Sequence, residues 1–562
     1  MKTKLLHWGA FLLMLVVMTA CSNNSKSSEL LKVIPADMDL VVVGDVETAL
    51  QSAGGSLEDS RLQIPVYITD QLSKSEMEKV NELNSFLKSS GVNIQACAFA
   101  GRYESNSPFV IFKIDDLETF KKALGEAEYR EWEIEEKTLS YLKTTYYSED
   151  MDYNRYDFLA VHGEYGYWVE NVYARQRAEV WKDVKNLIQS AQEKSMADMP
   201  YGKYMAEGNV LGVSFRIPRE FRREMSRMGI SSDLVNMYDG CICLKGDLTD
   251  DAAQIRFKWF DEEGKAKSPK DFAKFLNMEA TVNPDVLAYL PKDEHLVYAA
   301  TLKGIDWDSY LNMIESVMGL RSSERAQMVI AKSYLEKFDG TMAVGFGLTQ
   351  GVTSAFNLSH EEEIMDQFVF TVLCETKEGK AKSLINDLKT LLSNFNGVEY
   401  SSRPSGLTVN LPENQGSVYL EAKDDVLILS NRPVKKHKDN ATVQEVSFKD
   451  KLAAIGLVLP RTIPLMRDFG LENDAKMEMS FDAKEFEFSM EMALTGQESV
   501  GFIEKFVKSI QQIESRQDQL REKWQDERHR RLYETPDTDS MYSDSAALDS
   551  VVADSVAYDY GY

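Results

Sequence analysis

The chain has 562 residues, 43% hydrophobic and 27% charged, so it holds enough apolar material for two or three globular domains. Its 64 basic and 90 acidic residues give a formal net charge of −26. This balance argues against a nucleic-acid partner and against electrostatic docking on anionic lipid, because both need clustered lysine and arginine.

The N-terminus predicts export and lipidation. Lys2 and Lys4 precede an apolar stretch, residues 5–17, which is too short to span a bilayer comfortably. Met18-Thr19-Ala20-Cys21 follows and resembles the bacterial lipobox. That resemblance implies cleavage before Cys21 and attachment of diacylglycerol to its thiol.

We therefore expect residues 1–20 to be a lipoprotein signal peptide and residues 21–30 a polar tether. The lipid on Cys21 should anchor the protein to a membrane. We expect an outer-membrane lipoprotein, on either the periplasmic or the cell-surface face. The spacer is neutral to basic until Glu29, so the sequence does not choose between these faces. The alternative is an ordinary secretory signal with a chance cysteine.

A short strand opener occurs twice, at residues 33–43 and 289–299. Each has an apolar residue, then proline (Pro35 or Pro291), one further residue, an aspartate and, after two more residues, an apolar run. Proline suits the start of a strand because it has no N–H to donate to the ladder. The aspartate can close a turn by bonding to nearby backbone.

Each opener leads through a candidate helix, at residues 46–53 and 307–319, to further segments that resemble each other. The pairs are Gln95–Gly101 with Gly340–Phe346, Phe109–Ile114 with Phe368–Leu373, their following helices 117–124 and 380–392, Phe158–Val161 with Val426–Asn431, and Gln254–Trp259 with Phe486–Glu491. This order indicates a divergent internal duplication. The alternative is one large α+β domain whose strands look alike.

The expected fold is α+β, with two related halves that each have a mostly antiparallel sheet and packed helices. We expect the first half to cover residues 31–260, a linker 261–284 and the second half 285–512. A C-terminal helix and a disordered tail follow them.

The cysteines give no disulfide framework. Cys97 and Cys374 lie inside apolar strand runs, where a free thiol behaves as a small hydrophobe. Cys241 and Cys243 alternate, which places them on one strand face. We expect buried free thiols, with Cys97–Cys374 as the candidate bridge if one forms in the oxidising compartment.

The sequence has no motif for catalysis or for a cofactor. It has no phosphate-binding glycine loop, no nucleophile elbow and no His or Cys spacing suited to a metal. We therefore assign no catalytic residue, no cofactor and no metal ligand.

The C-terminus predicts a helix and then a tail. From Ser499 apolar residues recur at helical spacing, and residues 513–533 continue as an exposed charged helix. Residues 534–562 are acidic and should be disordered. Asp-Ser-apolar triplets recur there every five residues and resemble the O-glycosylation acceptor of Bacteroidota, at Ser540, Ser545, Ser550 and Ser555.

The lipobox, the opener Ile34-Pro35-Ala36-Asp37 and its mixed α/β continuation resemble the Bacteroidota lipoproteins grouped as domain of unknown function 4836. That family implies no activity and no site residues. The sequence favours a non-catalytic binding or scaffold protein of the cell envelope, with an unidentified protein or glycan partner. The alternatives are a solute- or glycan-binding lipoprotein and, with less support, a hydrolase.

Overall fold

The structure is a computed structural model that describes most residues between Ser25 and Tyr533. The gaps are residues 59–60, 71, 104–107, 126–129, 134–137, 147–154, 174–175, 228–234, 236–238, 269–276, 319–321, 349–367, 394–398, 411–415, 464–465, 467–470 and 497–499. The chain divides into two compact units between Ser509 and Ile510. The signal peptide, Cys21 and the tail from residue 534 lie outside the described residues.

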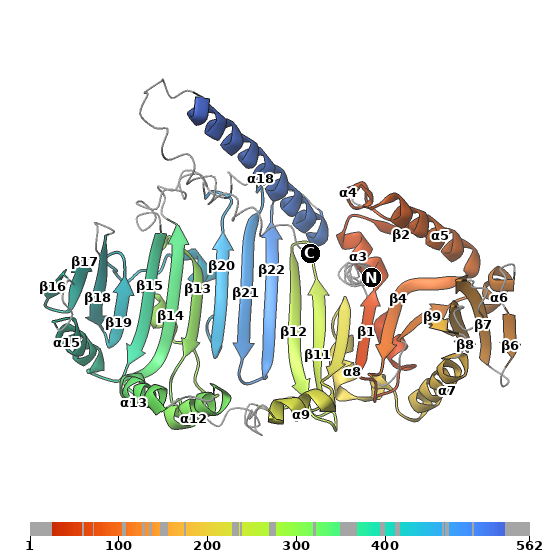
Figure 1. Ribbon diagram of the computed structural model, residues 1–562, viewed down its shortest axis with the longest axis horizontal. Coiled ribbons are helices and arrows are strands. Elements are labelled where there is room, and N and C mark those ends of the chain that lie inside the picture. Colours follow the sequence, from red (N-terminus) through yellow and green to blue (C-terminus); the bar gives the residue numbers. More distant parts are fainter. Residues whose placement is uncertain are drawn as a thin grey trace, which may run out of the picture. The chain divides into compact units, whose positions relative to one another are not determined.

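The first unit is built on one antiparallel sheet of 20 strands (Figure 1). The strand pairings give this order: β6 (Arg130–Glu133), β7 (Thr138–Tyr146), β8 (Arg155–His162), β9 (Tyr165–Tyr173), β5 (Phe109–Ile114), β4 (Val92–Gly101), β1 (Leu40–Asp45), β10 (Leu211–Arg216), β11 (Cys241–Leu248), β12 (Ala252–Phe260), β22 (Glu487–Thr495), β21 (Asp474–Asp482), β20 (Ala453–Leu459), β13 (Glu294–Thr301), β14 (Phe338–Leu348), β15 (Phe368–Thr376), β19 (Val426–Ser430), β18 (Ser417–Lys423), β17 (Gly406–Asn410) and β16 (Glu399–Arg403). A separate hairpin joins β2 (Ser56–Glu58) to β3 (Arg61–Gln63).

Helices fill the connections between strands. They are α2 (Ser25–Leu31), α3 (Val46–Ser52), α4 (Val66–Thr69), α5 (Lys74–Ser90), α6 (Leu117–Gly125), α7 (Arg177–Glu193), the 3₁₀ turn η3 (Met196–Asp198), α8 (Pro200–Ala206), α9 (Arg219–Arg227), α11 (Pro284–Leu287), α12 (Trp307–Met318), α13 (Ser322–Leu335), α15 (Lys380–Ser393), α16 (Ala441–Glu445) and α18 (Phe502–Tyr533). The expected mixture of helices and antiparallel strands is therefore correct.

Local sequence explains where these elements begin and end. Helix α5 begins with a capping box, in which Ser73 and Glu76 bond to each other's backbone N–H groups. It ends at Gly91, whose φ of 66° is a left-handed conformation that glycine adopts without strain. Helix α8 has Pro200 in its first turn, where no intrahelical N–H bond is lost.

Both openers lead to the predicted strand and helix. The first precedes β1 and α3, and the second precedes β13 and α12. A buried side chain holds the backbone of each opener. The Tyr201 hydroxyl donates to the Ala36 carbonyl at 2.5 Å, and the Asn440 amide donates to the carbonyls of Pro291 at 2.6 Å and Glu294 at 3.1 Å.

Hydrophobic clusters lie on both faces of the sheet. One contains Leu30 and Leu31 of α2 packed with Val41 and Ala98 of the sheet. Another joins α11 and α16 to strands β13 and β20. Near the start of α18, Phe502 and Ile503 pack with α3 and the ends of the central strands, as the predicted helix requires.

One expected match between the repeated segments is wrong by one strand. Residues 158–161 lie in β8, which pairs with β7 and β9. Residues 426–430 form β19, which pairs with β15. The strand that pairs with β5 as β19 pairs with β15 is β9, so residues 165–173, not 158–161, hold the equivalent place in the sheet.

Replacing Asn440 with alanine should lower the free energy of unfolding by about 2–4 kcal/mol. The change removes both bonds to the second opener and the cap of α16, where the Asn440 side chain accepts from the Val443 N–H at 3.0 Å. Urea denaturation monitored by tryptophan fluorescence measures the loss. Asn410→Ala, at an exposed position, is the control and should change it by less than about 0.5 kcal/mol; equal losses would contradict the prediction.

Candidate functional site

The predicted site residues do not form one site. Cys21, Ser540, Ser545, Ser550 and Ser555 lie outside the described residues, so their predicted modifications stay predictions. Cys97 lies on β4 and Cys374 on β15, and both thiols are free. Nine strands (β1, β10, β11, β12, β22, β21, β20, β13 and β14) separate β4 from β15, so the candidate Cys97–Cys374 bridge does not form.

Cys241 and Cys243 are buried, Cys97 and Cys374 are partly buried, and the pKa is raised in all of them except Cys241, where the hydrogen bond with Cys243 lowers it. Burial raises the pKa of Cys97 and of Cys374 to about 11. Cys241 and Cys243 lie on one face of β11 as predicted, with their sulfur atoms 3.7 Å apart. Burial also raises the pKa of Cys243, so this thiol is protonated near neutral pH and is a poor nucleophile.

The described part of the chain shows neither a metal cluster nor a membrane-spanning helix. Within it, no three His, Cys, Asp or Glu side chains are grouped so that they could hold a metal ion. No helix among the described residues is both long enough and apolar enough to span a bilayer.

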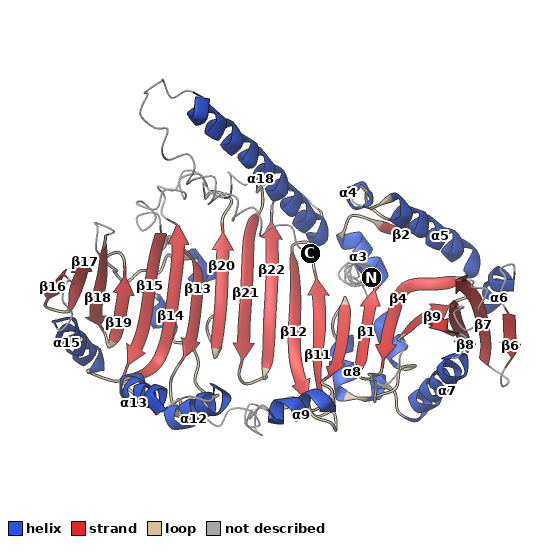
Figure 2. Cartoon of the chain, viewed as in Figure 1, coloured by secondary structure: helices blue, strands red, loops and turns tan. Residues whose placement is uncertain are grey.

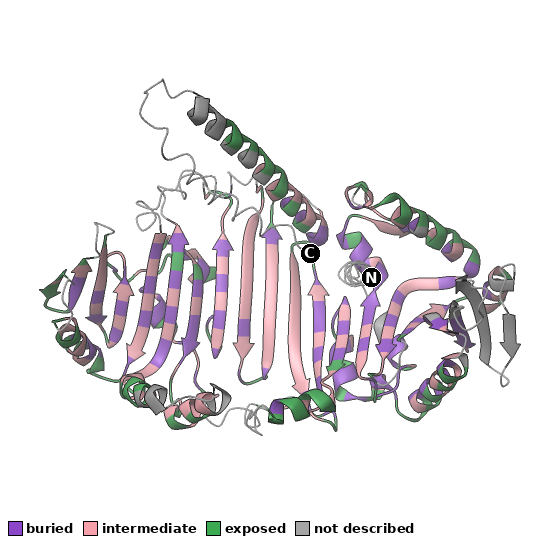
Figure 3. Ribbon diagram, viewed as in Figure 1, coloured by how far each residue is buried: buried purple, intermediate pink, exposed green. Residues whose placement is uncertain are grey.

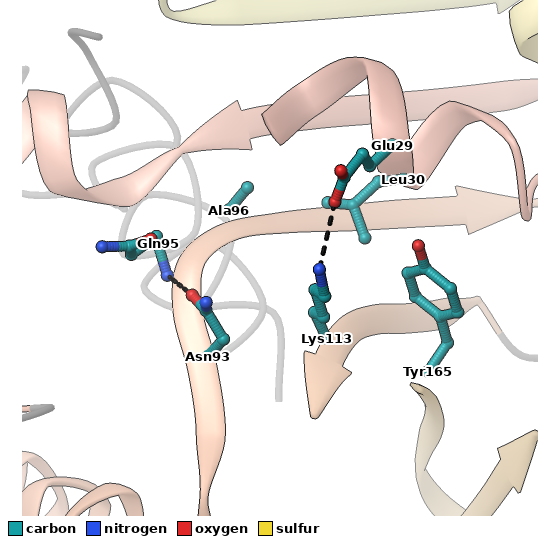
Figure 4. Close-up of a pocket in the computed structure, with 7 residues that line it drawn as sticks. All are labelled: Glu29, Leu30, Asn93, Gln95, Ala96, Lys113 and Tyr165. Atoms are coloured by element: carbon teal, nitrogen blue, oxygen red, sulfur yellow. Dashed lines mark hydrogen bonds and ion pairs between the residues drawn. The ribbon is translucent and has the colours of Figure 1, made fainter. Parts of the chain in front are cut away.

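A small pocket lies between α2 and strands β4, β5 and β9 (Figure 4). Its volume is about 190 Å³, below the range of roughly 300–1,000 Å³ that is usual for small-molecule sites. Lys113 is already engaged there, since its ammonium lies 3.2 Å from the Glu29 carboxylate. The Tyr165 ring lies beside this pair. The pocket can hold water or a small polar group, but its charges neutralise each other.

The most unusual surface is in the middle of the sheet. Figure 2 shows no described helix over the middle of β12, β22 and β21. These strands are partly exposed along almost their whole length, without alternating buried and exposed residues (Figure 3). Within the described part of the chain, both faces of the middle of these strands are thus partly open to solvent.

One of these faces is apolar except for the indole N–H of Trp259 near the end of β12. Directly paired residues share a face, so the register Ile255–Met490–Met479–Ile455 forms one row across four strands. Phe257, Phe488 and Phe481 form the next row. We call the following set the apolar face, all of it partly exposed: Ile255, Phe257, Phe488, Met490, Met492, Met477, Met479, Phe481, Ile455 and Leu457.

The opposite face of the same strands is charged. Lys476 lies 3.2 Å from Glu491 and 3.4 Å from Glu478, and Lys258 lies 3.3 Å from Glu485. An antiparallel sheet with one open side normally turns its polar residues to water and covers its apolar side. Here the charged face is the ordinary solvated one, and the apolar face is the anomaly.

This surface was missed from the sequence, although a signal for it exists. The alternation in residues 254–259 and 486–491 predicts strands, but it does not say that the apolar side lacks a cover. Met477, Met479, Met490 and Met492 alternate with polar residues, and methionine is the residue that adapts most readily to varied apolar ligands. The arrangement can bind an apolar partner and offers no group for covalent chemistry.

A second anomaly is the buried Glu294, at the start of β13. Its side chain is 0% exposed, and neither carboxyl oxygen makes a hydrogen bond of ordinary geometry with a described residue. A Cβ on Gly345 would lie 1.8 Å from one of these oxygens, so only glycine leaves the carboxyl room. Burial raises its pKa to about 8, while the nearby Thr371 hydroxyl lowers the pKa and Asp293 raises it.

Comparison with known proteins finds no relative from which a role for these residues could be assigned. No protein-family profile matches the chain, and no curated protein matches it. A solved structure with some similarity is a protein of unknown function from the DUF3598 family of Nostoc punctiforme, at 7% identity. The alignment covers 73% of this chain and 96% of that one, with a TM-score of 0.09, so the likeness carries no argument.

Glu294 should make stability fall as pH rises. Its pKa lies above the ordinary 4.5, so the folded protein holds a proton that the unfolded chain releases. Relative to Glu294→Gln, the natural chain should lose about 1.4 kcal/mol of unfolding free energy per pH unit between pH 4.5 and about 8. Urea denaturation at several pH values measures this difference.

The matched control is Glu445→Gln, at an exposed position of α16. It should leave the pH dependence of the natural chain unchanged. A Glu294→Gln protein whose stability follows pH as the natural chain does would contradict the assignment.

Proposed function

We propose that the protein is a lipid-anchored, non-catalytic binding protein of the cell envelope. The observation that carries the binding role is the apolar face, formed by ten uncharged side chains on strands whose middle no described helix covers; at one end Met492 packs with the start of α18. Contiguous apolar surface that stays partly open to solvent is a common mark of an interaction site. If the folded part of the chain is anchored to the membrane through its N-terminus, the apolar face can bind a partner.

The anchor rests on the N-terminal sequence. The basic start, the short apolar stretch and the run ending at Cys21 occur together and in the order of a lipoprotein signal. Helix α2 begins at Ser25, so only residues 21–24 separate the lipid from the folded body. The proposed location is the outer membrane, on its periplasmic or its outer face.

We also propose that the body arose by duplication and belongs with the domain of unknown function 4836 lipoproteins. Strand order supports the duplication. Two series of ten strands extend in opposite directions from the β12–β22 pair, and in both the strands follow one another across the sheet in the same relation to their order in the chain. The first series is β12, β11, β10, β1, β4, β5, β9, β8, β7 and β6, and the second is β22, β21, β20, β13, β14, β15, β19, β18, β17 and β16. The openers precede β1 and β13, which hold the same place in the two series.

The two series differ in one buried layer. Met38, Phe109 and Val169 are buried in the first. The corresponding residues of the second series are Glu294, Thr371 and Ser430. Glu294 stands three residues after the opener proline, as Met38 does, and the strand pairings then match Thr371 with Phe109 and Ser430 with Val169. The second copy has thus exchanged an apolar layer for a polar one, which is a change that divergence after duplication produces.

A glycan-binding role has less support than an apolar partner. Aromatic rings are present on the apolar face, with Phe257 and Phe488 packed 5.8 Å apart. A sugar also needs hydrogen-bonding groups beside the ring, and no member of the apolar face, as defined above, carries one.

Replacing Cys21 with serine should abolish lipidation. Two acyl chains, each CH₂ contributing about 0.8 kcal/mol, hold a protein stably on a membrane. In cells fed an alkyne-tagged fatty acid, the natural chain should carry the tag and sediment with membranes, and Cys21→Ser should do neither. Cys97→Ser is the matched control and should keep the tag, since Cys97 lies within β4. A tag that persists in Cys21→Ser would refute the anchor.

The tail should carry glycan on four serines. The intact mass of native protein should exceed that of the bare lipidated chain, and joint replacement of Ser540, Ser545, Ser550 and Ser555 by alanine should remove the excess. Ser543→Ala is the control, because this serine follows tyrosine rather than aspartate and should leave the mass excess in place. A native mass equal to that of the bare lipidated chain would contradict the assignment.

A further inference from the structure

We infer that the apolar face binds the hydrocarbon chains of single lipid molecules, such as fatty acids or lysolipids. This inference deepens the proposed binding role and rests on it. The ligand is lipid bound one molecule at a time, and not the surface of a bilayer.

Complementarity between the face and its ligand favours hydrocarbon. A protein partner brings backbone and side-chain polar groups, which lose hydrogen bonds to water when they are buried. The Phe257 row contains no group that could replace those bonds, and the Met490 row has only the Tyr298 hydroxyl, beyond Ile455 at its end. A hydrocarbon chain has no such groups, so its burial costs no hydrogen bond and gains the full hydrophobic contribution.

The residue types also suit a flexible ligand. Four methionines on β21 and β22 lie side by side in the register pairs Met477–Met492 and Met479–Met490. Methionine side chains are unbranched and polarisable, so they can fit chains that lie in many conformations. Phenylalanines at the adjoining row give the surface a rigid border.

The chain's own anchor is not the occupant. Leu30 and Leu31 of α2 pack with Val41, whereas the neighbouring Val42 points to the other side of the sheet. Val42 is in the row of the apolar face, through the register Val42–Val213–Leu244–Phe257. The described chain therefore begins on the side opposite the apolar face. Residues 21–24 reach at most about 14 Å, too short to bring the anchor around the sheet.

The same geometry argues against a bilayer as the ligand. A short tether on the opposite side turns that side toward the anchoring membrane and leaves the apolar face directed away from it. A second copy is also disfavoured, because it would bring together two chains that each have a net charge of −26. A single lipid satisfies both constraints.

The test uses the full chain with Cys21→Ser, purified without detergent, so that no acyl anchor competes. The probe is a dansyl-labelled undecanoic acid, whose fluorescence rises and shifts to the blue in apolar surroundings. We expect saturable binding to this protein. Adding Met490→Glu should weaken binding at least about tenfold, because the ligand would then bury a charge.

The matched control is Ser489→Glu, the same new side chain on the neighbouring residue of β22, which points to the charged face. It should change the affinity less than about twofold, because its carboxylate lies in water. Circular dichroism establishes that each variant is folded. If Met490→Glu does not fold, Met479→Gln on β21 provides the same test with a smaller change.

Four results would overturn the inference, the first three in the binding assay itself. These three are an absence of saturable probe binding, equal weakening by Met490→Glu and Ser489→Glu, and loss of dimers in Met490→Glu without any binding of probe to the Cys21→Ser chain. Flotation with phosphatidylcholine vesicles in place of binding to dissolved probe would also overturn it, in favour of a bilayer. Because the assay omits the anchor, its outcome is independent of the fatty-acid labelling that tests Cys21.

Discussion

The pairing of β12 with β22 is the constraint on which the rest of the fold depends. It joins Ala252 to Ala493 and continues in unbroken register to Lys258 and Glu487. Because a strand has only two edges, each strand of the pair gives its other edge to its own series, β11 on one side and β21 on the other. This β12–β22 pairing, which we call the seam, therefore joins the two series into one continuous sheet. Its register decides which residues lie in the same row on the apolar face and on the charged face.

Much of the local structure could be predicted from the sequence. The openers, the helices after them and the start of α18 were found because proline, helical spacing and apolar runs act over a few residues. The mistaken match of residues 158–161 in β8 with residues 426–431 around β19 has a different cause. Antiparallel strands share one alternating pattern, so the pattern does not say which strand pairs with β5 or β15. The candidate Cys97–Cys374 bridge failed for the same reason, since strand order sets their separation.

The two anomalies of the site escaped prediction for related reasons. An alternating strand such as residues 487–495 predicts an apolar side but not whether a helix covers it. Glu294 stands in the opener between Asp293 and His295, where a polar residue is typical of an exposed turn. Its burial depends on Gly345, a residue 51 positions later in sequence that the pairing of β13 with β14 brings beside it. Tertiary contacts decide both features.

The β12–β22 pairing also limits the order in which the sheet can fold. Gln254 of β12 and Glu491 of β22 bond to each other across 237 positions of sequence. Until the last strand, β22, has been synthesised, β12 is a free edge whose N–H and C=O groups can pair with another strand. Contacts this distant form slowly, because a long loop must close first. Strand β12 therefore keeps an open edge until residues 487–495 have been made, and correct folding depends on that edge not pairing with another strand first.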